Sequence, residues 1–195
     1  MTSPEATPFA ILTVCTGNVC RSPAAERLLT AGLDATVYVR SAGTHAIVGD
    51  PISGPMVSLL TGAGADADHF AARQVSVNAV RQADLILTMS REHRAVAVDL
   101  WPGAVRRTFT LREFARALTA ADLSGTPTGA TQGERLAAAT PLAAQMRGQG
   151  QGHDPSEDDV IDPYRRSPEV YQQSFDQIMP SVQTIIRIAR GPRPA

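Results

Sequence analysis

A short stretch near the N-terminus, Val14–Pro23, carries a thiol at Cys15 and a guanidinium at Arg21, with five residues between them. It follows an apolar run, residues 9–14, that is typical of a buried strand. A loop of this length can turn successive backbone N–H groups toward one point and wrap an anion. The spacing would put the thiol under the anion and the guanidinium beside it, which indicates cleavage of a phosphate ester through a cysteine nucleophile.

The residues within the loop suit such a turn. Gly17 can take a positive φ without cost, and Asn18 tolerates that region better than most residues. We expect Ser22 to be the N-cap and Pro23 the first residue of a helix to about Leu33, whose positive end would face the same anion. The expected phosphate-binding residues are Thr16, Gly17, Asn18, Val19, Cys20, Arg21 and Ser22.

The expected chemistry follows from the charges around this loop. A free thiol has a pKa of about 8.5, whereas a helix N-terminus, inward amides and an arginine all favour the thiolate. The thiolate would attack phosphorus to form a phosphocysteine, while the loop amides and Arg21 hold the equatorial oxygens. The loop and the arginine supply the positive charge, so we expect no metal and no cofactor.

The stretch resembles the signature loop of the low-molecular-weight protein tyrosine phosphatases. Residues 40–44, residues 83–89 and the Asp162-Pro163-Tyr164 segment resemble that family in the same order. The resemblance implies that Asp162 is the general acid for the leaving phenolate and later the base that activates water. It also implies that Tyr164 flanks the cleft and stacks on a substrate ring.

The resemblance implies supporting roles as well. Asn18 would brace the loop, held in turn by Ser41 and His69, which match the family's positions. Apart from the resemblance, we expect the hydroxyl of Ser22 to donate to the Cys15 thiolate and stabilise it as a leaving group, which is compatible with a plain N-cap role. His69 would thus be structural rather than a base.

Cys20 and His93 have plainer interpretations. Cys20 is either a small residue packed under the loop or the partner of Cys15 in a reversible disulfide that shields the nucleophile from overoxidation. His93 resembles a surface residue.

Strand and helix signals alternate along the chain. Further strands are expected at 35–39, 85–89 and 107–109, and helices at 51–60, after Ser90, at 111–118 and from Pro168 after the cap Ser167. Such alternation predicts an α/β fold with a parallel sheet covered on both faces. The resemblance specifies three αβα layers, a sheet of about four twisted strands and a phosphatase I-like fold.

The length of 195 residues predicts one domain, residues 9–190, between a flexible N-terminus at 1–8 and a tail at 191–195. Residues 119–159 break the alternation and are rich in Ala, Gly, Gln, Thr and Pro. We expect an insertion there, with a helix at 132–146 interrupted by Pro141 and a flexible segment at 148–152. It is either a tolerated surface insertion or a lid or docking segment, and residues 157–159 are expected to be a solvated acidic run rather than a metal site.

The composition limits the classes of partner and the cellular compartment that we expect. A formal net charge of −1 gives no indication of nucleic acid or an anionic membrane as partner. No apolar run approaches membrane-spanning length, and residues 1–8 lack the features of a signal peptide. The two cysteines, both in the loop, predict a reducing cytoplasm rather than a disulfide framework.

The substrate is the least determined expectation. Val19 stands where relatives that cleave phosphoarginine carry Thr, which favours phosphotyrosine. A phosphoarginine phosphatase and an arsenate reductase on the same fold remain alternatives, although such reductases usually need cysteines outside the loop. A catalytically silent phosphotyrosine-binding module is the alternative of another class.

One further resemblance bears on the partner. Residues 162–167 and 46–49 resemble the bacterial branch paired with tyrosine kinases of capsule or exopolysaccharide export. It implies a phosphotyrosine protein as substrate, such as the tail of a bacterial tyrosine kinase. Arg165 and Arg166 could favour acidic residues near the phosphotyrosine.

Overall fold

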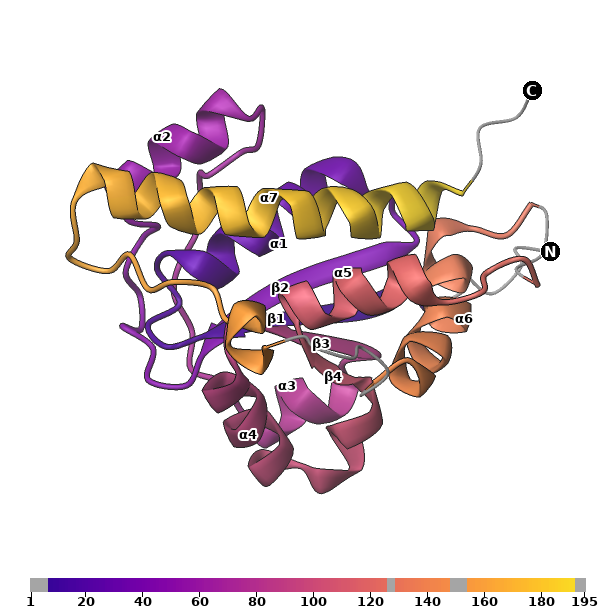
Figure 1. The fold of residues 1–195 in the computed structure, drawn as a ribbon. Coiled ribbons are helices and arrows are strands. Elements are labelled where there is room, and N and C mark those ends of the chain that lie inside the picture. The colour runs from indigo at the N-terminus through magenta and orange to yellow at the C-terminus, as the bar shows by residue number, and fades with distance from the viewer. Residues whose placement is uncertain (1–6, 126–128, 148–153, 192–195) are drawn as a thin grey trace, which may run out of the picture.

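A parallel sheet of four strands forms the centre of the molecule (Figure 1). The computed structural model describes residues 7–125, 129–147 and 154–191, so the expectations for residues 1–6, 148–152 and 192–195 lie outside the described residues. The strands are β1 (Phe9–Cys15), β2 (Val37–Gly43), β3 (Leu85–Thr88) and β4 (Thr108–Thr110), in the order β2-β1-β3-β4. This confirms the predicted α/β class with a small parallel sheet.

The register of the sheet brings its functional ends together. Cys15, the last residue of β1, pairs with Gly43 at the end of β2, and Val14 pairs with Thr88 at the end of β3. Ligands of parallel sheets bind beyond the carboxyl ends of the strands. The loop after Cys15 therefore begins at that edge.

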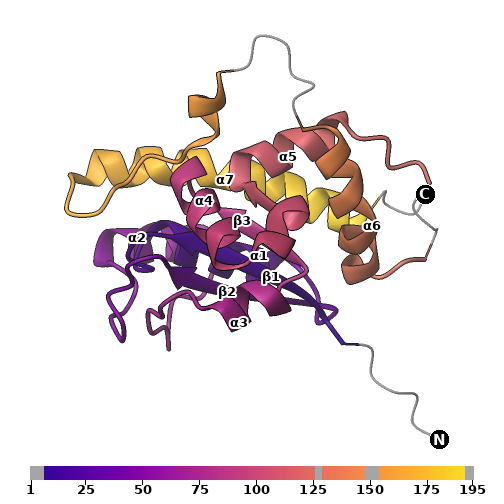
Figure 2. The same ribbon diagram turned by 90° about the horizontal axis from the view of Figure 1, so that it is seen from below.

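Helices cover both faces of the sheet. One face carries α1 (Arg21–Gly32), α5 (Leu111–Ala120), α6 (Gln132–Gln145) and α7 (Pro168–Arg190), with α2 (Gly54–Gly62) beside α7. The other face carries α3 (Val77–Gln82), α4 (Arg91–Leu100) and the 3-10 turn η1 (Pro102–Arg107), as the view from below shows (Figure 2). Among the described residues, no helix is both long and apolar enough to span a bilayer.

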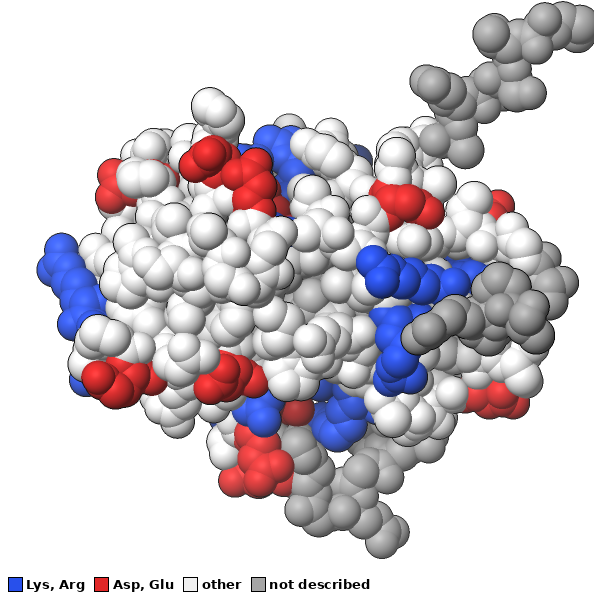
Figure 3. Space-filling view, turned by 90° about the horizontal axis from the view of Figure 1, so that it is seen from above, with Lys and Arg blue, Asp and Glu red and all other residues white. Residues whose placement is uncertain are grey.

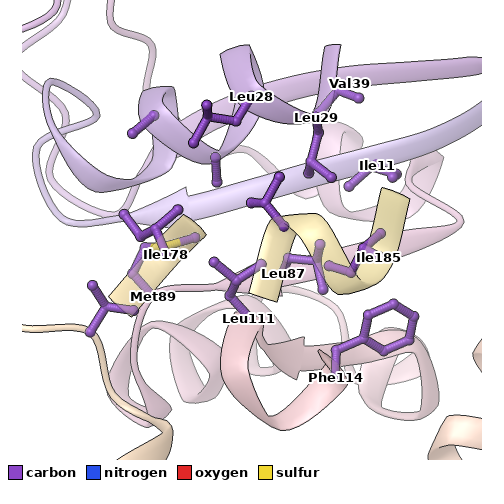
Figure 4. Close-up of a cluster of buried hydrophobic side chains, with 14 of the residues drawn as sticks. Ile11, Leu28, Leu29, Val39, Leu87, Met89, Leu111, Phe114, Ile178 and Ile185 are labelled. Atoms are coloured by element: carbon purple, nitrogen blue, oxygen red, sulfur yellow. The ribbon is translucent and has the colours of Figure 1, made fainter. Parts of the chain in front are cut away.

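The larger core lies between the sheet and the first of these helical layers. It joins alternate strand residues such as Ile11, Val39 and Leu87 to apolar faces of α1, α5 and α7 (Figure 4). The predicted stripe of α7 is buried as expected: Tyr171, Phe175, Ile178, Val182, Ile185 and Ala189. A smaller core on the other face packs β1 and β3 against α3 and α4.

Two expectations about helices are wrong. The first helix begins at Arg21 with Cys20 as its N-cap, so Ser22 is not the cap and Pro23 lies inside the first turn. The loop runs directly into the helix, which leaves the Ser22 hydroxyl available for other contacts. The helix α6 is also continuous through Pro141 rather than interrupted there.

The helix α6 is not a surface insertion. Its residues Leu136, Ala139 and Ala143, spaced by three and four positions, have at most 1% of their surface exposed and join the main core. Thr131 and Glu134 form a capping box at its start. The interpretation of the whole 119–159 stretch as a tolerated surface insertion is therefore wrong for this helix.

Candidate active site

The loop between β1 and α1 is tied down through its carbonyl groups. The backbone N–H groups of Thr44, His45, Ile47 and Ser53 donate to the carbonyl oxygens of Cys15, Thr16, Gly17 and Val19 at 2.8–3.0 Å. In a trans peptide the N–H of the next residue points the opposite way. The amides that follow these carbonyls therefore face the concave side of the loop, as an anion nest requires.

Asn18 is the residue with the left-handed backbone in this loop. Its φ is 56°, whereas Gly17 does not adopt a positive φ, so the expectation for Gly17 is wrong. The Asn18 side chain donates to Ser22 Oγ at 3.0 Å and to Ser41 Oγ at 2.8 Å. Those two bonds fix the strained turn from inside the molecule.

The bracing of Asn18 differs from the expectation in one partner. Its side-chain oxygen accepts from the backbone N–H of Arg73 at 2.8 Å. His69 is exposed and has a φ of 53°, so the structure does not bring it to Asn18. Ser41 lies where expected, and its hydroxyl also donates to the buried carboxylate of Glu26.

Cys15 and Ser22 are in direct contact. Cys15 Sγ lies 2.9 Å from Ser22 Oγ, and both residues are buried. Because Ser22 Oγ already accepts from Asn18, its proton is free for the sulfur or, at 3.4 Å, for the carbonyl of Ala42. A buried chain of hydrogen bonds therefore runs from Glu26 through Ser41, Asn18 and Ser22 to the sulfur.

Arg21 and Asp162 meet across nearly the whole sequence. Arg21 Nη2 lies 2.7 Å from Asp162 Oδ2, and Arg21 Nη1 donates to the carbonyl of Val160 at 3.0 Å. The guanidinium is buried, while half of the Asp162 side chain is exposed to solvent. A cavity of about 160 Å³ joins them to the nucleophile; it is lined by Cys15, Thr16, Gly17, Val19, Cys20, Arg21, His45, Ile47, Asp162 and Tyr164.

The acidic residues upstream of Asp162 anchor its segment. Asp159 accepts from the Arg91 guanidinium at 3.0 and 3.1 Å and from the Arg91 backbone N–H at 2.8 Å. Asp158, which is buried, pairs with Arg116 at 2.7 Å. The expectation of a solvated acidic run fits Glu157, which is exposed, and is wrong for Asp158 and Asp159, whose ion pairs fix this segment against α4 and α5.

His93 is a site residue that the sequence reasoning missed. Only 6% of its surface is exposed, so the expectation of a surface residue is wrong. Its Nε2 lies 2.8 Å from Thr16 Oγ1 and its Nδ1 lies 2.8 Å from Ser90 Oγ. Burial, aided by the nearby Arg21 cation, lowers the pKa of His93 to about 4. The one available signal was its position three residues after the helix cap Ser90, which places it on the cap's side of the helix.

Cys20 turns away from the nucleophile's partners. Its Sγ lies 3.6 Å from the Tyr171 hydroxyl, which also contacts Ser53 Oγ at 2.8 Å. Burial raises the pKa of the Cys20 thiol to about 11. Both cysteines are free thiols in the structure, and the reversible disulfide stays a prediction.

Tyr164 lies at the mouth of the cavity with 39% of its surface exposed. The Arg165 guanidinium lies 5.1 Å from the centre of its ring, and Arg165 has a φ of 58°. An aromatic side chain at this position can contact the ring of a bound aryl phosphate.

A second, larger hollow lies away from this site. It has a volume of about 1290 Å³ between α1, α6 and α7, and among the described residues its lining includes no cysteine, histidine or carboxylate. Charged side chains are sparse across the middle of the face formed by α7 and α2 (Figure 3). Within the described residues, no cluster of histidine, cysteine or carboxylate side chains is suited to hold a metal.

Comparison with known proteins identifies the family. The family model described as "Low molecular weight phosphotyrosine protein phosphatase" matches residues 10–127. The match ends before Asp162, so the position of that residue beside Arg21 comes from the structure alone.

Individual relatives and a solved structure agree with this family match. The low molecular weight protein-tyrosine-phosphatase Wzb of Salmonella typhi is 42% identical over 92 residues, 47% of this chain and 61% of that protein. The chain thus matches about three fifths of the length of that curated relative. The protein-arginine-phosphatase of Geobacillus stearothermophilus is 37% identical over 107 residues, 55% of this chain and 72% of that protein. The structure of the Erwinia amylovora tyrosine phosphatase AmsI has a TM-score of 0.66 at 22% identity, covers 95% of each chain and supports the fold. This chain belongs to the low molecular weight phosphotyrosine protein phosphatase family.

Proposed function

We propose that this protein is a protein-tyrosine phosphatase that hydrolyses phosphotyrosine through a phosphocysteine on Cys15. One observation carries the proposal: the guanidinium of Arg21 and the carboxylate of Asp162 meet at 2.7 Å over the cavity that contains Cys15. A nucleophile, an anion-binding arginine and a proton donor are the groups that such a transfer needs.

The proposed reaction has two steps. The Cys15 thiolate attacks phosphorus, the S–P bond forms, the bond from phosphorus to the phenolic oxygen breaks, and Asp162 donates its proton to that oxygen. In the second step the Asp162 carboxylate takes a proton from water, whose oxygen attacks phosphorus, and the S–P bond breaks. The Ser22 hydroxyl at 2.9 Å stabilises the departing thiolate.

Phosphotyrosine is favoured over the other substrates of this fold. Val19 lines the cavity with an apolar side chain, and Tyr164 offers a ring at its mouth. Phosphoarginine is the second candidate, because the arginine phosphatase of Geobacillus stearothermophilus is among the relatives. Arsenate reduction is a further alternative, and binding without turnover is an outcome that the experiment below separates.

We further propose a partner and a location. The substrate would be a phosphotyrosine protein, with the tail of a bacterial tyrosine kinase as the candidate, and the enzyme would act in the cytoplasm. The similarity to Wzb supports the resemblance of this chain to the bacterial branch paired with tyrosine kinases.

The test is turnover of phenyl phosphate and a phosphotyrosine peptide panel, with phosphoarginine and arsenate as competitors and EDTA present throughout. We expect hydrolysis that survives the chelator. Cys15→Ser should abolish turnover while phosphate binding persists. Near-normal turnover by Cys15→Ser would contradict the mechanism.

The role of Asp162 has its own signature. Asp162→Ala should slow phenyl phosphate hydrolysis by about 10²- to 10⁴-fold, and the much better leaving group p-nitrophenolate should lose less, because general acid catalysis matters most for poor leaving groups. Asp176→Ala, which removes an exposed carboxylate from α7, is the matched control and should be neutral. Equal losses on both substrates would exclude Asp162 as the acid.

The redox role of the two cysteines is a separate proposal. Peroxide would oxidise the Cys15 thiolate to a sulfenic acid and be reduced to water; attack by the Cys20 sulfur would then form the disulfide and release a second water. Oxidised protein should lose two hydrogens by intact mass and regain activity with dithiothreitol. Cys20→Ser should instead be inactivated irreversibly, and reversible inactivation of that variant would rule the disulfide out.

A further inference from the structure

The imidazole of His93 connects helix α4 to the phosphate loop. It stands in the first turn of α4, three residues after Ser90, and both ring nitrogens lie 2.8 Å from a hydroxyl oxygen. Thr16, on the loop side, is the residue directly after Cys15 and lines the cavity. Thr16 Oγ1 is also 3.4 Å from Nη2 of Arg21.

Charge fixes the donor at the Arg21 end of this series of hydrogen bonds. A guanidinium only donates, so Arg21 Nη2 presents an N–H to a lone pair of Thr16 Oγ1. The Thr16 hydroxyl keeps its own proton, which His93 Nε2 accepts when the neutral ring carries its proton on Nδ1. In that tautomer Nδ1–H donates to Ser90 Oγ, which also accepts the backbone N–H of His93 at 3.3 Å.

We propose that His93 is a positioning residue for phosphate binding, which it serves by orienting the Thr16 hydroxyl so that a lone pair faces Arg21. This inference rests on the proposed function. Thr16 Oγ1 and the carbonyl of Val160 hold the Arg21 guanidinium from two different segments, and Asp162 holds it from the cavity side.

The arrangement matters when a phosphate binds. The phosphate takes the place of the Asp162 carboxylate on Arg21, so that carboxylate no longer restrains the guanidinium. The Thr16 and Val160 oxygens remain and keep the guanidinium plane fixed, and less conformational freedom is lost on binding. A positioning role of this kind affects substrate and transition state alike, so it belongs to KM rather than to kcat.

The central variant is His93→Phe, which keeps a ring of similar shape and removes both hydrogen-bonding nitrogens. We expect KM for phenyl phosphate and the Kd of inorganic phosphate to rise by about 3- to 10-fold, the change that loss of one ordinary hydrogen bond gives. The value of kcat should change by less than about twofold. His93→Gln, whose amide oxygen can reach the position of Nε2, should restore both constants to within about twofold of wild type.

A double-mutant cycle distinguishes this role from general destabilisation. Because His93 acts through the Thr16 hydroxyl, Thr16→Val should have the same effect as His93→Phe, and the double variant should be no worse than either. Thr16→Ser, which keeps the hydroxyl, should resemble wild type. Glu92→Gln, an exposed neighbour in the same helix turn, is the matched control and should leave KM and Kd unchanged.

Inorganic phosphate binding is measured by calorimetry on the Cys15→Ser background, which needs no turnover. If wild type fails to hydrolyse aryl phosphates, the proposed function fails, and the phosphate titrations still decide the role of His93. Unchanged Kd in folded His93→Phe, or multiplying effects in the cycle, would overturn the inference. If His93→Phe does not fold by circular dichroism, His93→Gln and the Thr16→Val and Thr16→Ser pair decide it: a normal Kd in Thr16→Val would overturn it.

Discussion

The buried imidazole of His93 is the most perturbed basic side chain near the loop. Burial removes water from the ring, and Arg21 is the cation that faces it from α1, so the neutral form is favoured. Asp162 and Asp159 face it from the acid segment and oppose this shift only in part. The ring can therefore accept a hydrogen bond throughout the physiological pH range.

This shift predicts a pH dependence of stability. The pKa of His93 is about 4 in the folded protein against 6.5 for an unperturbed imidazole, so between these values the unfolded state binds more protons. The free energy of unfolding should therefore rise with pH across this window and reach its full value above about pH 6.5, with a total of about 3 kcal/mol from this group.

The measurement is the urea midpoint from pH 4 to 7 for wild type and His93→Phe. Wild type should lose more stability on acidification than the variant, which lacks the titrating ring. His69→Gln, which removes an exposed imidazole, should follow wild type. Parallel curves of urea midpoint against pH for wild type and His93→Phe would contradict the lowered pKa of His93.

Single residues differ in how far the sequence predicts them. Cys15 and Arg21 lie in one loop, so their spacing alone indicated an anion site. His93, the partner of Thr16, lies 77 positions away from it along the chain. Arg73, the partner of Asn18, lies 55 positions away. No local pattern encodes such contacts, because they depend on how β3, α4 and the segment after α2 pack around the loop.

The segment that presents Asp162 is an element fixed at several points. The Val160 N–H donates to the carbonyl of Met89 at 2.8 Å, and the Val160 carbonyl accepts from Arg21. Asp159 binds both the side chain and the backbone N–H of Arg91 at the start of α4, where a carboxylate also suits the helix dipole. The carboxylate of Asp162, our proposed general acid, is therefore presented by a segment fixed at several points rather than by a free loop.

Asp159→Asn tests this element. The amide keeps the shape but loses the charge that binds Arg91, so Asp162 should be held less well. We expect kcat for phenyl phosphate to fall by about fivefold, which corresponds to one ordinary hydrogen bond of about 1 kcal/mol, while the Kd of phosphate stays close to wild type. Asp176→Asn is the control. An equal change in Kd and kcat would assign Asp159 to phosphate binding instead.

At the scale of helices and strands, the sequence predicted which elements exist better than it predicted which segments they contact. The strands and the long last helix were expected from apolar periodicity, but residues 157–159 looked solvated because charge runs usually are. The arginine partners of Asp158 and Asp159 come from α5 and α4, which a linear pattern does not bring near.

The core of the molecule as a whole includes the helix α6. Beyond its buried apolar stripe, the guanidinium of Arg147 contacts Glu113 Oε1 at 3.0 Å and the carbonyls of Val105 and Thr108 at 3.0 and 2.6 Å. The same group lies 4.1 Å from the centre of the Phe109 ring. These contacts join the end of α6 to β4 and α5, so this part of the 119–159 stretch completes the core.

Arg147→Met should measure that connection. Methionine keeps the apolar stem but leaves the buried Glu113 carboxylate and two carbonyls with fewer partners, so we expect a loss of about 2–3 kcal/mol in the free energy of unfolding. Arg187→Met, an exposed position on α7, should stay within about 0.5 kcal/mol of wild type. Urea unfolding measures both. A negligible loss of unfolding free energy in Arg147→Met would show that this connection between α6, β4 and α5 does not stabilise the core.

The pairing of Arg21 with Asp162 would give the proposed reaction an order of events. Arg21 Nη2 binds the Asp162 carboxylate in the structure, so a phosphate that took this nitrogen would displace the proposed proton donor in the same exchange. Under the proposed mechanism, Asp162 would approach the departing oxygen only after a phosphate dianion had replaced it on Arg21. Small monovalent anions, which offer Arg21 no more than Asp162 already does, should be poor competitors.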